Sequence, residues 1–193
     1  MPEPLIHFAV PFSILVAKGV DSKRALLLSF IALLPDLDVL LHVHRSWTHS
    51  MLIPLAVLAT AVLIRRRCSK WLVVALLAYI SHLVLDLFTA YTPILWPLYE
   101  WPLWLKVSLN VRVASLPMDV KLVVELLREP TSTTFAYLDV VEGEVMTGEG
   151  LLISSALIVA PLVARLRRAE ALAGPGGLEP PTPGSGGRCS TPS

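Results

Sequence analysis

The chain has 193 residues, of which 54% are hydrophobic and only 16% are charged, and its mean hydropathy is +0.67. Soluble globular domains usually carry about a quarter of charged residues, so this composition argues against an ordinary soluble domain and indicates a membrane protein. The formal net charge of +1 provides no basic field and therefore no indication of nucleic-acid binding.

The first apolar stretch covers residues 5–20 and contains His7. It is just long enough for a short membrane span, because the hydrocarbon core takes roughly 20 helical residues. No basic region and no small-residue cleavage site accompany it, so we expect a retained span and not a signal peptide. Asp21 follows directly and is a suitable N-cap for the next helix.

The second apolar run covers residues 25–41 and is interrupted by Pro35. Proline removes a backbone donor and clashes with the preceding turn, so the helix is predicted to kink or end there. Asp36 and Asp38 would then lie on irregular backbone. Such backbone is tolerated at membrane depth only where it lines a cavity or is buried in protein.

Two further apolar runs follow, at residues 47–64 and 71–88. The first is closed by three consecutive arginines, and the second is the clearest single span in the sequence. Tryptophans and tyrosines interleaved with prolines then occupy residues 91–104, a pattern typical of an aromatic belt at the membrane interface on non-helical chain.

Residues 105–114 alternate between apolar and polar side chains, which predicts a half-buried strand. Residues 118–128 have helical spacing and precede Pro130, which predicts a helix. With residues 131–150 these elements would form a small water-facing subdomain. The last apolar run, at residues 151–164, is predicted to be a fifth span.

The whole pattern predicts an all-α polytopic membrane protein with about five transmembrane helices and a small extramembrane insertion of one strand and one helix. The expected parts are a membrane domain at 1–104, the insertion at 105–150, the last transmembrane helix at 151–168, and a tail at 169–193. Eleven of the last twenty residues are Gly or Pro, so we expect no folded structure there. Cys68 and Cys189 form no recognisable motif, and no disulfide is expected.

The basic residues favour an orientation with the N-terminus outside the cell membrane, because ten of those flanking the five runs would then face the cytoplasm and five would not. In that orientation the candidate ligands all lie at one depth, toward the extracytoplasmic side. These candidates are His7, Asp36, Asp38, His44, His49, His82 and Asp86.

Ionisable side chains at membrane depth are costly unless they face a protein interior or a wet cavity, so they indicate function. His82 and Asp86 are four apart and share one face of a helix, where nitrogen and oxygen could bind one metal ion. The alternative is a structural ion pair, but Arg45 is the only nearby cation in the sequence. Histidine mixed with aspartate favours zinc, and manganese or iron would accept the same ligands.

Three segments resemble the signature blocks of the YdjM-like family of inner-membrane-associated, metal-dependent hydrolases. They are residues 34–38, 44–50 and 81–89, and His7 lies where that family has an N-terminal histidine. The resemblance covers roughly residues 1–100 with order and spacing retained. Ser46 and Ala90 stand where the family usually has glycine.

The resemblance implies a reaction and a set of roles. The family is grouped by distant similarity with the zinc-dependent phospholipase C and single-strand nuclease superfamily, whose helical sites also use a His-x-x-x-Asp pair. By this resemblance the seven candidates are metal ligands and the reaction is phosphoester hydrolysis. Asp38 or Asp36 would be the catalytic base where it is not a ligand, and Arg45 would hold an anionic group of a lipid or lipid-linked phosphate substrate.

Two other functions remain open at this point. A proton- or ion-coupled transporter would use the Asp and His residues as a relay, and a membrane interaction protein would use the motifs only for structure. A relay predicts polar residues spread through the depth of several spans, whereas the candidates bunch at one end. Neither the oligomeric state nor the substrate can be read from the sequence.

Overall fold

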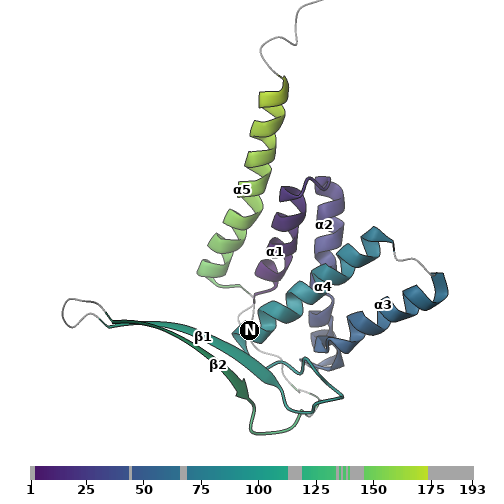
Figure 1. The fold of residues 1–193 in the computed structure, drawn as a ribbon, viewed down its shortest axis with the longest axis vertical. Helices are drawn as coiled ribbons and strands as arrows, with labels where there is room; N and C mark the ends of the chain where they lie inside the picture. The colour runs from purple at the N-terminus through teal and green to yellow at the C-terminus, as the bar shows by residue number, and fades with distance from the viewer. Residues whose placement is uncertain are drawn as a thin grey trace, which may run out of the picture.

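The computed structural model describes residues 3–43, 45–65, 69–112, 119–133 and 146–173, together with Phe135, Tyr137 and Asp139. Figure 1 shows the helices gathered on one side and a long two-stranded sheet reaching away from them. The elements in chain order are α1 (Pro4–Ala17), α2 (Ser22–Phe30), η1 (Ile31–Leu33), η2 (Pro35–Leu41), η3 (Trp47–His49), α3 (Leu52–Arg65), α4 (Lys70–Thr89), β1 (Leu103–Arg112), β2 (Asp119–Arg128) and α5 (Gly148–Ala173), where η denotes a 3₁₀ helix.

A tight turn joins α1 to α2. Gly19 has a φ of +82°, a conformation that glycine adopts without a Cβ clash, and it directly follows the last turn of α1. The Asp21 side chain then accepts a hydrogen bond of 3.1 Å from the backbone N–H of Lys23, which confirms the predicted cap. The two helices therefore pack side by side around Phe12, Val16 and Ala25.

The predicted break around Pro35 is confirmed. The α-helical hydrogen bonding of α2 ends at Phe30, and the chain continues through the 3₁₀ helices η1 and η2, of which the second begins at Pro35. His42 ends η2 with a φ of +56°, a left-handed conformation that terminates the helix. Asp36 and Asp38 therefore lie on tightly wound 3₁₀ backbone.

The predicted architecture of about five membrane-spanning helices in an all-α protein is wrong. Only α4 and the segment Gly148–Ala171 of α5 are long and apolar enough, among the described residues, to be candidate membrane spans. The α1 and α3 helices have 14 residues each and α2 has 9, so at 1.5 Å per residue they rise no more than about 21 Å, short of the roughly 30 Å hydrocarbon core. The count of basic residues assumed five crossings and so gives no orientation.

The region after α4 contains a second correction. The predicted strand is present as β1, but the helix predicted for residues 118–128 is wrong, because β2 occupies Asp119–Arg128 and pairs with β1 in an antiparallel sheet. The segment fits both the period of a helix and that of a strand, since its apolar residues also alternate at Val120, Leu122 and Val124. Pairing with β1 along ten residues decides between the two.

Contacts between distant segments hold the helices together. The α5 helix packs along α1, where Ile158 and Leu162 contact the Phe12 and Val16 cluster. At the start of both helices the Glu3 carboxylate accepts hydrogen bonds from the backbone N–H and the hydroxyl of Thr147. The α4 helix packs against η1. This arrangement brings the beginning of α1 close to the end of α4, where the candidate site lies. Residues 169–173 of the expected tail are helical and form the end of α5, and from 174 onward the tail lies outside the described residues.

Candidate metal centre

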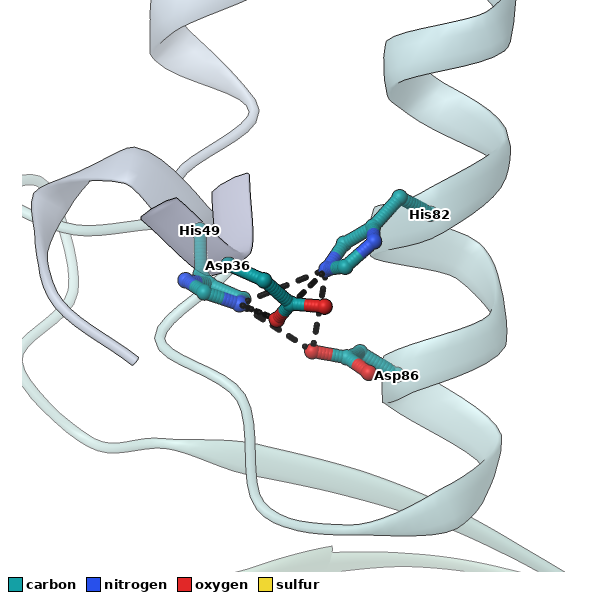
Figure 2. Close-up of side chains that lie close together, drawn as sticks. All are labelled: Asp36, His49, His82 and Asp86. Carbon is teal, nitrogen blue, oxygen red and sulfur yellow. Dashed lines mark hydrogen bonds and ion pairs between the residues drawn. The ribbon is translucent and has the colours of Figure 1, made fainter. Parts of the chain in front are cut away.

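Four of the predicted ligands meet at one point. Asp36 comes from η2, His49 from η3, and His82 and Asp86 from consecutive turns of α4 (Figure 2). One ligand atom from each of the four lies within 4.8 Å of all the others. Residues from three separate elements therefore present two nitrogens and two oxygens to a common centre.

Five of the six distances between these four atoms match the edges of a tetrahedral site. The Nε2 atom of His49 lies 3.6 Å from Asp36 Oδ1, 3.3 Å from Asp86 Oδ2 and 3.4 Å from His82 Nε2. His82 Nε2 lies 3.5 Å from Asp36 Oδ1 and 3.6 Å from Asp86 Oδ2. A regular tetrahedron with metal–ligand bonds of about 2.0–2.2 Å has edges of about 3.3–3.6 Å. The donor set thus fits a zinc-sized ion without large rearrangement.

Burial leaves one side of the cluster accessible. The His49, His82 and Asp86 side chains are fully buried, whereas the side chain of Asp36 is 18% exposed. Burying a charged or polar group without hydrogen bonds costs folding free energy. Neither Asp86 oxygen nor His82 Nδ1 has a hydrogen-bond partner among the described residues. A bound cation would compensate the Asp86 charge, and it would be reached from the side of Asp36.

Asp38 lies behind His49 and outside the four-residue group. Its Oδ2 atom is 3.4 Å from Nδ1 of the His49 ring, while the Nε2 atom of that ring points to the cluster. The same oxygen accepts hydrogen bonds of 2.8 Å from the Ser46 backbone N–H and 3.1 Å from the Thr48 hydroxyl. A carboxylate held in this way orients a histidine ligand and increases its basicity. The structure therefore places Asp38 beside the distal nitrogen of His49 and outside the group of four.

His7 lies next to the group on its other side. Its Nε2 atom is 3.4 Å from Asp86 Oδ1, and its ring centroid is 4.1 Å from that of His82. The side chain is 1% exposed and comes from the second turn of α1. His7 thus contacts the Asp86 oxygen that is not part of the four-atom cluster, where it could complete the coordination or bind a second ion shared through Asp86.

Arg45 links the cluster to a polar cavity. Its Nε atom lies 3.9 Å from Asp86 Oδ2, and its Nη1 donates a 3.1 Å hydrogen bond to the Tyr91 carbonyl. The adjoining cavity has a volume of about 320 Å³. Its lining residues are Arg45, Ala90, Tyr91, Pro93, Pro102, Glu129, Thr131, Ser132 and Thr133. A guanidinium group therefore lies between the candidate metal position and a space for a ligand.

The last of the predicted ligands, His44, lies outside the described residues. The neighbouring His42, which is not one of the predicted ligands, stacks on Tyr137 with ring centroids 5.0 Å apart and does not belong to the four-residue group. Ser46 and Ala90, which stand where the family usually has glycine, have φ values of −80° and −166°. Neither position requires glycine, because any residue adopts these conformations.

Sequence reasoning missed the residues that fix η3 in place. The Tyr79 hydroxyl of α4 donates a hydrogen bond to the Thr48 carbonyl, and the Ser50 hydroxyl donates one to the Trp96 carbonyl. The Met51 N–H donates to the Ile94 carbonyl at 2.9 Å. Hydroxyl side chains beside His49 were the available signal, but their partners are distant in sequence. The loop after α4 therefore supports the candidate ligand His49.

The carboxylates around His49 favour its protonated form. Burial alone would lower the pKa of this imidazole, but the close contacts with the carboxylates of Asp36, Asp38 and Asp86 outweigh burial and raise it from 6.5 to about 10. The carboxylates therefore require a positive charge between them at neutral pH. A metal ion would replace the proton with a larger charge.

We expect zinc binding at pH 7 to release about one proton, because His49 must lose its proton to become a ligand. The pKa near 10 lies above the working pH, so the release should diminish as the pH rises through 10. Titration calorimetry in two buffers of different ionisation enthalpy measures the number released. An enthalpy of binding that does not depend on the buffer would contradict the assignment of His49 as a ligand.

Comparison with known proteins identifies one family. The model of a family described as YdjM inner membrane protein matches residues 4–169. No curated protein and no solved structure matches the chain. The match extends well beyond the region of roughly residues 1–100 that carries the three motif segments, and it includes the two-stranded sheet and most of α5.

Proposed function

This chain belongs to the YdjM family of inner membrane proteins, and from that premise we propose that it is a membrane-bound, metal-dependent hydrolase that cleaves phosphoesters. The observation that carries the proposal is the tetrahedral spacing of Asp36, His49, His82 and Asp86. Two carboxylates and two imidazoles are a donor set that suits zinc and would also accept manganese.

The roles of the surrounding residues follow from their positions. When bound, a zinc ion supplies a Lewis acid that polarises an ester oxygen and makes a neighbouring water molecule more acidic. Asp36 is the partly exposed member of the group, so an incoming water would reach the ion from its side, and the carboxylate oxygen of Asp36 that does not face the two histidines could accept its proton. Asp38 acts through His49 as a positioning residue, since its oxygen faces Nδ1 of that ring.

Arg45 is the proposed binding group for the anionic part of the substrate. Its guanidinium lies within 3.9 Å of Asp86 and lines the polar cavity of about 320 Å³. The planar fork of arginine matches the oxygens of a phosphate better than a point charge does. A phosphoryl group held there would lie beside the metal position, with the rest of a polar head group in the cavity.

A lipid or lipid-linked phosphate is the proposed substrate class. A second cavity of about 470 Å³ is lined almost entirely by apolar side chains from α1, α2 and η1, together with Met146. It includes Phe8, the neighbour of His7, and Leu33, which lies one 3₁₀ turn before Asp36. An apolar space next to one side of the cluster and a polar space next to the other suit a molecule with a hydrocarbon tail and a phosphate head.

The transporter alternative has less support. The buried histidine and aspartate of α4 are His82 and Asp86, and both lie in the second half of the helix. A proton or ion relay would need polar groups through the whole depth of the bilayer. A relay protein should also purify without a metal ion, which distinguishes it from a hydrolase.

The proposal predicts zinc-dependent hydrolysis by the purified protein in detergent or lipid. Chromogenic phosphomonoesters and phosphodiesters, and then phospholipids, are the substrates to screen, with and without a chelator. We expect activity with zinc and its loss on chelation. Failure of the zinc-loaded protein to cleave any of these esters would refute the hydrolase proposal.

A variant tests the role of Arg45 in the same assay. Arg45→Lys keeps the charge but loses the two-pronged contact, so we expect KM to rise by about tenfold, the effect of losing roughly 1.4 kcal/mol of binding. Arg24→Lys, on the exposed part of α2, is the matched control and should leave KM unchanged. An unchanged KM in Arg45→Lys would place the substrate elsewhere.

A further inference from the structure

One face of the two-stranded sheet is aliphatic and uncovered. The pairing places Val107 opposite Val124, Leu109 opposite Leu122, and Val111 opposite Val120. Residues directly opposite each other share a face, so these side chains lie together with those of Leu105 and Leu126. We call these eight residues the aliphatic face. Seven of them, all but Leu105, are between 48% and 67% exposed.

The other face of the sheet has a different composition. Alternation places Lys106, Ser108, Asn110, Lys121 and Glu125 there, together with the half-buried Trp104, Val123 and Leu127. An isolated pair of strands is at best marginally stable in water, and soluble proteins rarely expose a contiguous apolar patch larger than a few hundred Å². The aliphatic face therefore needs an apolar partner that the described residues do not supply.

The base of the sheet, where β1 begins and β2 ends, lies at one end of the candidate membrane helices. The Trp104 indole N–H donates a 3.2 Å hydrogen bond to the Phe88 carbonyl near the end of α4. The start of α5 is joined to the start of α1 by the Thr147 to Glu3 hydrogen bonds. His7 in α1 lies 3.4 Å from Asp86 in α4, so these three helix ends lie at one level. Figure 1 shows the sheet extending sideways from this level, across the direction of α5.

We propose that the sheet is an interfacial element whose aliphatic face rests in the lipid bilayer while its lysine-bearing face points to water. Elements with one apolar and one basic face bind in this way at the boundary between head groups and acyl chains. The base of the sheet has the residues of such a boundary, because Arg128 lies 4.7 Å from the Trp101 ring and Lys106 lies 5.8 Å from the Trp104 ring.

Continuity with the membrane helices favours lipid over a second copy of the chain as the partner. The sheet leaves the helices at the level where α4 ends and α5 begins, so a bilayer crossed by those helices would already lie beside it. Ten residues per strand span about 33 Å, which allows the aliphatic face to lie along the bilayer surface over its whole length. Lys106 and Lys121 would then remain hydrated near anionic head groups.

Spin labels test this placement in the full-length protein. In a background with Cys68 and Cys189 replaced by serine, single cysteines are introduced as Leu109→Cys and Leu122→Cys on the aliphatic face. The matched controls are Ser108→Cys and Asn110→Cys, which lie in β1 on the other face of the sheet. The labelled proteins are reconstituted into vesicles of phosphatidylethanolamine and phosphatidylglycerol, and the collision rates of each label with oxygen and with a water-soluble nickel complex are measured.

For labels at positions 109 and 122 we expect the collision rate with oxygen to exceed that with the nickel complex severalfold. For labels at positions 108 and 110 we expect the nickel complex to collide more often than oxygen. Equal exposure of both faces to the nickel complex would overturn the proposal. So would protection of 109 and 122 from both reagents together with spin coupling between labels on different chains, because a second copy would then cover the face. Unchanged helical circular dichroism in all four variants excludes misfolding as the cause.

Discussion

Replacing His49 by alanine is expected to leave the purified protein without its metal ion and without hydrolytic activity. The side chain is fully buried and its Nε2 atom lies 3.3–3.6 Å from the other three ligand atoms, so alanine removes one corner of the tetrahedron. Elemental analysis should find roughly one zinc per chain in the wild type and far less in the variant.

The matched control for this experiment is His42→Ala. His42 is also a histidine on the segment between α2 and α3, but it stacks on Tyr137 instead of facing the cluster. It should retain its zinc and its activity. Thermal unfolding gives a second measurement, because zinc at 1,000 times its Kd stabilises a protein by about 4 kcal/mol. Zinc should raise the Tm of the wild type and of His42→Ala but not that of His49→Ala. Equal zinc content in both variants would contradict the proposed centre.

Two aspartate variants should differ in how strongly they weaken zinc binding. Asp86→Asn keeps the shape of the side chain but removes the charge from a proposed ligand, so we expect the affinity to fall by more than about 100-fold. Asp38→Asn changes a residue that meets His49 at its distal nitrogen, and loss of such a supporting partner costs about 10–100-fold. Competition with a zinc-binding dye measures both constants.

The order of these two effects tests the arrangement of the site. Asp21→Asn, at the cap of α2, is a control that should bind zinc as the wild type does. If Asp38→Asn weakened binding as much as Asp86→Asn, Asp38 would be a direct ligand and the proposed supporting role would be wrong. If neither variant changed the affinity, zinc would bind elsewhere.

The sequence was most informative where spacing along one element determines geometry. His82 and Asp86 are four residues apart in a helix, and both point to the same centre. The broken helix at Pro35 was also predictable, since proline interrupts helical hydrogen bonding wherever it occurs in a helix interior. The different positions of Asp36 and Asp38 were not, because they depend on which nitrogen of His49 each carboxylate meets.

The errors arose where apolar composition was taken as a measure of helix length. Residues 25–41 are apolar enough for a membrane span, but α2 ends at Phe30 and the chain then winds into two 3₁₀ helices that carry the aspartates. Hydropathy counts side chains and does not report where the backbone changes its hydrogen-bonding pattern. The strand β2 was missed for a related reason, since its valines and leucines satisfy both helical and alternating spacing until a partner strand is considered.

The joining of α1 to α5 has a consequence for how the protein is made. The ribosome synthesises α1 before the other described elements, yet the side chains of Ile158 and Leu162 that pack on it, and the Thr147 that binds Glu3, emerge only after all the other described helices and strands. His7 therefore leaves the ribosome long before the last of the contacts that hold its helix has been made. A nascent chain that stopped before α5 would contain every residue of the four-member cluster but would lack the support for the histidine beside it.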